Sequence, residues 1–445
     1  MRAREVLDSR GNPTVEAEVR TEGGFFGWAI VPSGASTGKR EAVERRDGGK
    51  RFSGKGVLKA VEAVNSEIRD AIVGMDAKEQ REIDQALISL DGTPQKSKLG
   101  ANAILAVSLA VCRASASALK VPLHERIAQI YASAGSVIER KKMPTPMFNV
   151  INGGKHAGNE LSIQEFLIIP TGFERFSDKL RAGAEIYHAL KGILERKYGK
   201  IATNVGDEGG YAPPMRETVE ALDALSQAIA EAGYGEGGEV KMGMDAAAST
   251  FFNGETGKYE IDGKTIEGAE MIDFYKELAA KYPIILLEDP FHEDSYELFA
   301  ELTREMPEKI IVGDDLFVTS AERLREGIEK GAGNAVLLKL NQVGTLTETM
   351  ETAVLAEKSG FKRVVSHRSG DTEDAFIADF SVGIAAELIK SGAPARGERT
   401  CKYNQLLRIE EQLTDLLPAP KDEGSRHGNF GCGIPHTARS ESHPL

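Results

Sequence analysis

Five ionisable residues in the second half of the sequence each follow a short apolar run. They are Asp245, Glu288, Asp314, Lys339 and His367, and successive members lie 25 to 43 positions apart. The runs are apolar on both faces, which is typical of parallel strands that are covered by helices. Because the shorter intervals fit one strand and one returning helix, we expect a series of βα units.

Repeated βα units close most naturally into a barrel, in which catalytic groups lie at the C-terminal ends of the strands. We therefore expect these five side chains to meet on one face. Three carboxylates that converge would repel one another unless a cation lay between them, and oxygen ligands favour magnesium over zinc. The alternative, that each acid only caps the following helix, explains one acid more easily than it explains all five residues together.

Three further residues extend this candidate site. Glu165 interrupts an otherwise apolar run, where an acid is either exposed at a sheet edge or directed into a site. Glu208 lies in Gly206-Asp-Glu-Gly-Gly210, whose glycines allow ligand and backbone to approach closely. Lys390 follows the short apolar pair Leu388 and Ile389, so it repeats the end-of-strand pattern.

A glycine-rich loop spans residues 33–39 and resembles a phosphate-binding P-loop only superficially. Three residues rather than four separate Gly34 from Gly38, and Lys39 is followed by Arg40 instead of serine or threonine. We therefore reject a nucleotide site. Two alternatives stay open, a flexible loop that offers the Ser36 hydroxyl to a ligand and a plain surface turn.

The composition of the 445 residues limits the classes of function. A formal net charge of −13 argues against nucleic acid or an anionic membrane as the main partner. The three cysteines form no CxxC motif, so neither a disulfide framework nor a zinc site is indicated. The N-terminus has no apolar segment of the signal-peptide type, and the nearly apolar residues 101–112 are too few to span a bilayer. We expect a cytoplasmic protein.

The order of sequence patterns predicts two domains and a tail. Residues 6–33 alternate in polarity like antiparallel strands, and helical patterns follow, including a buried helix over residues 101–119. Strands followed by helices predict a small α+β domain at residues 1–133. The βα units predict an α/β barrel domain at 143–420. Residues 421–445 lack periodicity, which predicts a disordered tail.

Several strings of the sequence resemble the enolase family, from about Arg4 to Leu417. They are Asp8-Ser-Arg-Gly-Asn-Pro-Thr14, Pro32-Ser-Gly-Ala-Ser-Thr-Gly38, Gly206-Asp-Glu-Gly-Gly210, Leu287-Glu-Asp-Pro-Phe291, Lys339-Leu-Asn-Gln-Val-Gly-Thr345 and Ser366-His-Arg-Ser-Gly370. The resemblance implies a small N-terminal α+β capping domain followed by an enolase-type (β/α)8-like barrel. It also implies the reversible dehydration of 2-phosphoglycerate to phosphoenolpyruvate in glycolysis and gluconeogenesis, carried out by a homodimer or a higher homo-oligomer.

The resemblance also implies roles for individual residues, with two Mg²⁺ ions in each active site. Asp245, Glu288 and Asp314 would hold the first ion, and Ser36 would help to bind the second with the substrate phosphate. Lys339 would be the base that takes the C2 proton, and Glu208 the acid that protonates the departing 3-hydroxyl. The supporting residues would be Glu165, His367 and Lys390, which position groups and balance charge, Arg368 and Ser369, which contact the phosphate, and His156, which closes over the site.

These roles need shifted pKa values. A lysine has an ordinary pKa near ~10.4, so neighbouring cations must lower the pKa of Lys339 before it can act as a base. Glu208 needs the opposite shift, which a nearby carboxylate such as Glu165 could supply.

Two other functional classes compete with this hypothesis. One is another enolase-superfamily enzyme, an acid-sugar dehydratase, racemase or cycloisomerase, but those relatives usually carry a Lys-x-Lys pair where this chain has Gly206-Asp-Glu-Gly-Gly210. The other is a non-catalytic structural or surface-binding protein that reuses the fold. A secondary pool at the cell surface or in the medium is compatible with the catalytic hypothesis.

Overall fold

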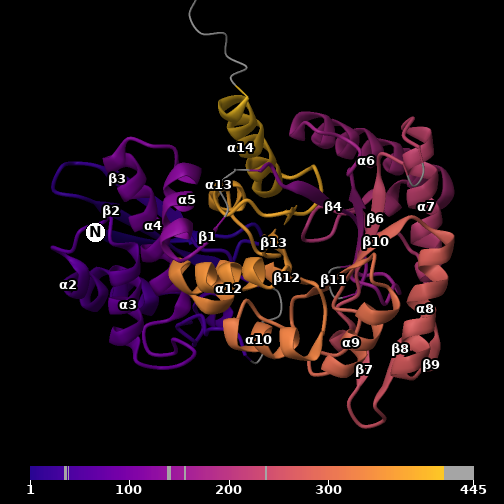
Figure 1. Ribbon diagram of the computed structural model, residues 1–445, viewed down its shortest axis with the longest axis horizontal. Helices are drawn as coiled ribbons and strands as arrows, with labels where there is room; N and C mark the ends of the chain where they lie inside the picture. Colours follow the sequence, from indigo (N-terminus) through magenta and orange to yellow (C-terminus); the bar gives the residue numbers. More distant parts are fainter. Residues whose placement is uncertain (35–37, 39, 138–141, 155–156, 236–237, 415–445) are drawn as a thin grey trace, which may run out of the picture.

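The computed structural model describes residues 1–34, 38, 40–137, 142–154, 157–235 and 238–414. Within these residues, a small N-terminal domain of strands and helices lies beside a larger closed barrel (Figure 1). The predicted tail at 421–445 lies outside the described residues, as do Ser36 and His156.

The N-terminal domain begins with a three-stranded antiparallel sheet. Its strands are β1 (Arg2–Leu7), β2 (Pro13–Arg20) and β3 (Phe26–Ile30), with β2 in the middle. Val15 and Ala17 are fully buried and alternate with the partly exposed Glu16 and Glu18, as the polarity pattern predicts. The first strand, β1, was not predicted, although it pairs with β2 along its whole length.

Several helical segments follow this sheet, and the longest of them packs on β2 and β3. They are α1 (Leu58–Ala63), a π-helical turn (Val64–Ile68), α2 (Arg69–Ile72), α3 (Gln80–Asp91), α4 (Ala101–Leu119) and α5 (Leu123–Ser133). Strand β3 approaches α4 so closely that a Cβ atom on Gly27 would lie 2.2 Å from the carbonyl oxygen of Ala110. Only glycine fits at this contact.

Helix α4 is the core of the small domain. It extends beyond the apolar residues 101–112, and among the described helices it alone is long and apolar enough to cross a bilayer. However, 78% of its most apolar window is buried inside the fold. Since this burial accounts for its composition, α4 is a core helix.

The second domain confirms the predicted barrel. Eight strands close in the order β10-β11-β12-β13-β14-β4-β5-β6. Their bounds are β4 (Thr145–Asn152), β5 (Glu165–Ile169), β6 (Lys241–Asp245), β10 (Ile284–Glu288), β11 (Ile310–Gly313), β12 (Ala335–Leu338), β13 (Lys362–Ser366) and β14 (Leu388–Lys390). All neighbouring pairs are parallel except those of β5, which runs antiparallel to both β4 and β6.

Helices surround the barrel strands in Figure 1. The helices of this domain are α6 (Phe176–Tyr198), α7 (Thr218–Glu231), α8 (Gly268–Lys281), α9 (Tyr296–Glu305), α10 (Ala321–Lys330), the short α11 (Leu340–Val343), α12 (Leu346–Lys358), α13 (Phe376–Gly383) and α14 (Gly397–Leu413). A small sheet of β7 (Phe252–Asn253), β8 (Lys258–Ile261) and β9 (Lys264–Ile266) is inserted between β6 and α8. This insertion explains the long interval between Asp245 and Glu288.

Apolar side chains from seven of the strands form a separate buried cluster. Its buried members are Met147, Leu167, Ile169, Leu286, Val312, Ala335, Leu337, Val364 and Leu388. A barrel of this size is filled by side chains rather than open as a pore. The polar residues at the strand ends therefore lie against an apolar layer and not against water on that side.

Candidate active site

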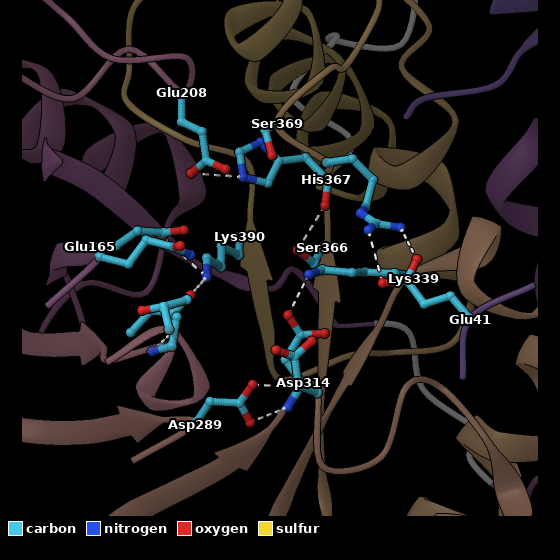
Figure 2. Close-up of a pocket in the computed structure, with 16 residues that line it drawn as sticks. Glu41, Glu165, Glu208, Asp289, Asp314, Lys339, Ser366, His367, Ser369 and Lys390 are labelled. Carbon is cyan, nitrogen blue, oxygen red and sulfur yellow. Dashed lines mark hydrogen bonds and ion pairs between the residues drawn. The ribbon is translucent and has the colours of Figure 1, made fainter. Parts of the chain in front are cut away.

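The polar strand ends meet in one cavity at the C-terminal end of the barrel (Figure 2). Among the predicted residues, the cavity lining includes Glu165, Glu208, Asp245, Asp314, Lys339, His367, Arg368, Ser369 and Lys390. Glu288 adjoins them through Lys390. Ser36 and His156 belong to the same hypothesis but lie outside the described residues.

Lys390, the last residue of β14, is the central cation of the cavity. Its Nζ atom lies 2.8 Å from Asp245, 2.9 Å from Glu288 and 3.1 Å from Glu165, and all four side chains are buried. Burial lowers the pKa of Lys390, but the surrounding carboxylates outweigh it and raise the pKa well above its ordinary value. Lys390 is therefore a permanent positive charge.

Glu165 reaches this cluster because β5 runs against its neighbours. It is the first residue of β5 and pairs with Asp245, the last residue of β6. An antiparallel strand brings its N-terminal end to the edge where the parallel strands end. Burial and the charge of Glu208 raise the pKa of Glu165 well above its ordinary value, although Lys390 acts in the opposite direction.

Lys339 follows β12 and forms an ion pair with Asp314, which follows β11. Burial lowers the pKa of Lys339, but the surrounding carboxylates, of which Asp314 acts most strongly, together outweigh burial, and the net shift is upward. The expected downward shift counts bound magnesium ions among the neighbouring cations. Among the protein's own groups, the strongest charge is the Asp314 carboxylate, and the cations Arg368 and Lys390 have the smaller effect.

The predicted metal ligands Asp245, Glu288 and Asp314 come from three adjacent strands, because β10 pairs with both β6 and β11. The Oε2 atom of Glu288 is buried and has no hydrogen-bond partner among the described residues. Burial and the charge of Asp245 raise the pKa of Glu288 well above its ordinary value. A buried carboxyl oxygen without a donor, in a set of acidic side chains, fits a hard divalent cation.

A second acidic group consists of Asp289, Asp314 and Asp315, whose oxygens lie within 4.8 Å of one another. The two carboxylate oxygens of Asp289 accept the backbone N–H groups of Asp314, at 2.9 Å, and Asp315, at 2.7 Å. Asp289 therefore braces the loop that carries Asp314. This role was missed, although Asp289 stands next to Glu288 in the sequence.

Glu208 and His367 occupy a different side of the cavity from Lys339 (Figure 2). The Oε2 atom of Glu208 accepts a 3.0 Å hydrogen bond from Asn149 and lies 3.4 Å from Nε2 of His367. Burial lowers the pKa of His367 to about 4. The imidazole is therefore neutral at pH 7.

The N-terminal domain contributes Glu41 to the cavity. Its carboxylate pairs with the Arg368 guanidinium at 3.0 and 3.1 Å, and Arg368 also donates to Asn341 at 2.7 Å. Sequence reasoning missed Glu41. The sequence feature that could have indicated Glu41 is its position just after the glycine-rich loop at residues 33–39. This loop meets the barrel through a β-bridge between Ser33 and Gly370.

A closed barrel with buried lysines and carboxylates at the C-terminal ends of its strands, capped by a smaller domain, defines an enzyme of the α/β-barrel class. Residues 1–127 match the family model described as "Enolase, N-terminal domain", and residues 140–420 match "Enolase, C-terminal TIM barrel domain". The chain therefore belongs to the enolase family.

Archaeal relatives named enolase cover nearly the whole chain. The protein of Methanocaldococcus jannaschii is 57% identical over 411 residues, which are 92% of this chain and 94% of that protein. The protein of Methanopyrus kandleri is 56% identical over 414 residues, 93% and 95% of the two chains. That of Pyrococcus furiosus is 55% identical over 412 residues, 92% and 94%. Membership of the family makes this chain a lyase and implies a divalent metal.

Proposed function

We propose that this protein catalyses the reversible dehydration of 2-phosphoglycerate to phosphoenolpyruvate with Mg²⁺, in glycolysis and gluconeogenesis. The observation that carries this proposal is the arrangement of one cavity, in which a lysine and a glutamate lie on different sides of a buried carboxylate cluster. The reaction removes a proton from the carbon beside a carboxylate and a hydroxyl from the next carbon. It therefore needs a base and an acid on different sides of the substrate.

Asp245, Glu288 and Asp314 would hold one magnesium ion, and Ser36 would contribute to a second. When bound, magnesium offsets the second negative charge that develops on the substrate carboxylate, as is general for enolase-superfamily sites, which use a lysine or histidine base with one or two Mg²⁺. The protein residues supply the remaining functions. Lys390 keeps Glu165, Asp245 and Glu288 together despite their like charges.

Lys339 would remove the C2 proton. Its ion pair with Asp314 keeps the amine protonated. Lys339 can therefore act as a base only when Asp314 is shared with another cation, so that Lys390 and Arg368 dominate the charges around it. Glu208, which is buried beside Asn149 and His367, would donate the proton to the departing 3-hydroxyl.

Arg368 and Ser369 would bind the substrate phosphate, with His156 closing over it. Arg368 is buried and already paired with Glu41. A phosphate dianion must therefore compete with this carboxylate, which a bidentate guanidinium–phosphate contact can do.

The test is the growth of enol-phosphate absorbance when 2-phosphoglycerate and magnesium are added to the purified protein. We expect turnover that is lost in Lys339→Ala and lost on chelation of the metal. A wild-type protein that produces no absorbance would remove the proposal, as would full turnover by Lys339→Ala.

The competing functions have less support. Both enolase family models match, together they extend over nearly all of residues 1–420, and the Lys-x-Lys pair of the racemase and cycloisomerase groups is missing from residues 206–210. A purely structural role has no need for the buried lysines and acids. We further propose domains at 1–133 and 143–420, a tail at 421–445, a cytoplasmic location and at least a dimer, without nucleic acid or membrane partners.

A further inference from the structure

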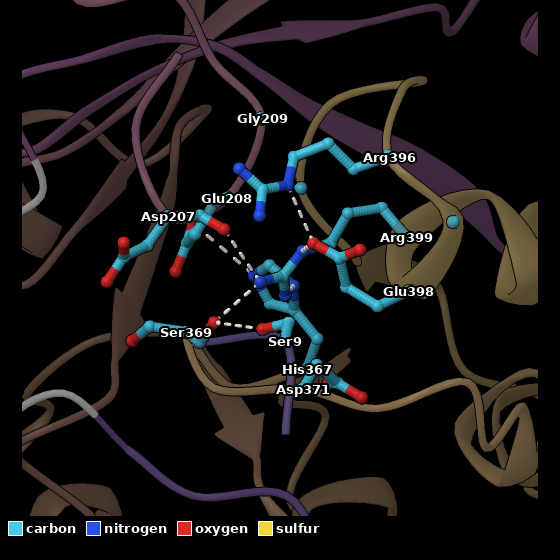
Figure 3. A network of polar contacts seen from close by, with 12 residues as sticks. Ser9, Asp207, Glu208, Gly209, His367, Ser369, Asp371, Arg396, Glu398 and Arg399 are labelled. Carbon is cyan, nitrogen blue, oxygen red and sulfur yellow. Dashed lines mark hydrogen bonds and ion pairs between the residues drawn. The ribbon is translucent and has the colours of Figure 1, made fainter. Parts of the chain in front are cut away.

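Arg399 is a fully buried cation that the sequence analysis did not single out. It lies in the first turn of α14, which begins at Gly397. Figure 3 shows its side chain between the loop that carries Glu208 and the loop that carries His367.

The guanidinium of Arg399 donates four hydrogen bonds to these two loops. Nη1 donates to Nδ1 of His367 at 2.6 Å and to the carbonyl oxygen of Arg368 at 2.7 Å. Nη2 donates to the carbonyl oxygens of Asp207 at 2.9 Å and Ser369 at 2.6 Å. One side chain thus joins the backbone next to the proposed acid to the backbone of both proposed phosphate ligands.

The contact with His367 determines where the imidazole proton lies. A guanidinium stays protonated and offers no acceptor, so Nδ1 of His367 must accept the bond with its lone pair. Because the buried ring is neutral, its single proton is then on Nε2. Nε2 is the atom that lies 3.4 Å from the Glu208 carboxylate.

We propose that Arg399 is a positioning residue that fixes the tautomer of His367, so that its proton is on Nε2, the ring nitrogen 3.4 Å from the Glu208 carboxylate. The tautomer follows from the contact with Arg399 and the neutral state of the buried ring, and its consequence for turnover rests on the proposed function. Without Arg399, the neutral ring could place its proton on Nδ1, and Nε2 would then offer no proton to the carboxylate that remains after Glu208 has protonated the departing hydroxyl.

Lys402 provides a matched control on the same helix. It is also buried, and it donates to Asp371 at 2.6 Å and to the carbonyl oxygen of Glu398 at 2.7 Å. It therefore ties α14 to the loop that follows His367, but none of its recorded contacts is with the imidazole. Replacement of Lys402 removes a buried cation from α14 but leaves the contact between Arg399 and His367 in place.

The first measurement is ¹⁵N NMR of protein labelled at its eight histidines, with His367 assigned by the signals that disappear in His367→Gln. Between pH 6 and 8 we expect a protonated Nε2 and an unprotonated Nδ1 at His367 in the wild type. A protonated Nδ1, or protons on both nitrogens, would overturn the proposal without any need for a variant.

The second measurement compares Arg399→Met, Arg399→Lys and Lys402→Met. Arg399→Met should lose the preference for a proton on Nε2. Its rate of product formation, relative to its rate of exchange of the C2 hydrogen with deuterated water, should fall about tenfold or more, because loss of a general acid typically has an effect of this size or larger. Arg399→Lys, which keeps one donor for Nδ1, should retain the tautomer. Lys402→Met should keep both the tautomer and the ratio of product to exchange.

Two outcomes would refute the role of Arg399 as a positioning residue. One is an unchanged His367 tautomer in Arg399→Met, and the other is an equal fall of product and exchange in that variant but not in Lys402→Met. If Arg399→Met does not fold, the wild-type spectrum and Arg399→Lys still decide. A wild-type protein with the expected tautomer but no turnover would remove the proposed function and leave the assignment of the tautomer intact.

Discussion

Replacement of Lys390 by methionine tests whether one buried cation balances the carboxylates of the cavity. The ammonium group lies within 3.1 Å of Glu165, Asp245 and Glu288, and its side chain is 3% exposed. Removal of one partner from a buried ion pair typically costs ~3–5 kcal/mol of stability. Since Glu165 and Glu288 already have raised pKa values and can take up protons, we expect a loss of about this size at pH 7 and not a multiple of it.

The pH dependence of this loss has a definite sign. Without Lys390, the pKa values of Glu165 and Glu288 in the folded state rise further above the ordinary value of ~4.3. The folded state then binds more protons than the unfolded state, so its stability falls as pH rises above that value. The difference between the wild type and Lys390→Met should therefore grow between about pH 5 and pH 8.

The assay is denaturant unfolding at several pH values in the presence of a metal chelator. The control is Lys276→Met, which removes the cation of an exposed ion pair with Glu305 at 2.6 Å. Exposed pairs contribute little to stability, so the control should barely move the midpoint. If Lys390→Met behaves like Lys276→Met, or if its loss does not change with pH, then Lys390 does not neutralise the carboxylates.

Three further predictions concern the proposed chemistry and the tail. Glu208→Gln should still exchange the C2 hydrogen with deuterated water but form little product, whereas in Lys339→Ala both rates should fall by ~10²- to 10⁴-fold. NMR of the C2 proton, recorded alongside product formation, measures both rates, and the opposite pattern would reverse the two roles. Asp314→Ala should keep the fold but bind magnesium more weakly in calorimetry, because one charged ligand is lost; full activity at ordinary magnesium would contradict this. Deletion of residues 421–445 should change neither melting temperature nor turnover much, since the family match ends at residue 420; a large loss of either would show that the tail packs on the protein.

The sequence predicts the parallel part of the barrel well because its signals are local. An apolar run that ends in a charged residue gives both a strand and its polar end, as at Glu288, Asp314 and Lys339. Helix α6 likewise follows a local pattern, because its long amphipathic period ends at Gly199. Such features depend on residues that are neighbours along the chain.

The sequence does not predict features that depend on distant parts of the chain. The alternatives for Glu165 could be separated only by the antiparallel direction of β5, which is set by its pairing with β4 and β6. Glu41 reaches Arg368 across 327 positions of sequence. Arg399 contacts Asp207 across 192 positions of sequence and His367 across 32. In each case the partner that gives the residue its role is distant in the sequence, so no pattern of neighbouring residues could indicate the contact.

The charges of the cavity are better explained by function than by stability. A buried ion pair contributes little net stability, because desolvation of both charges offsets their attraction, and well-packed apolar residues often serve as well. This barrel nevertheless carries Lys390, Lys339 and several acids against an apolar layer, which gives them no water on that side. Burial is also the main cause of the raised pKa of Glu288, ahead of the like charge of Asp245. A fold that needed only stability could fill this space with more of the apolar side chains below it, so the retained charges point to a site that must bind and move charge.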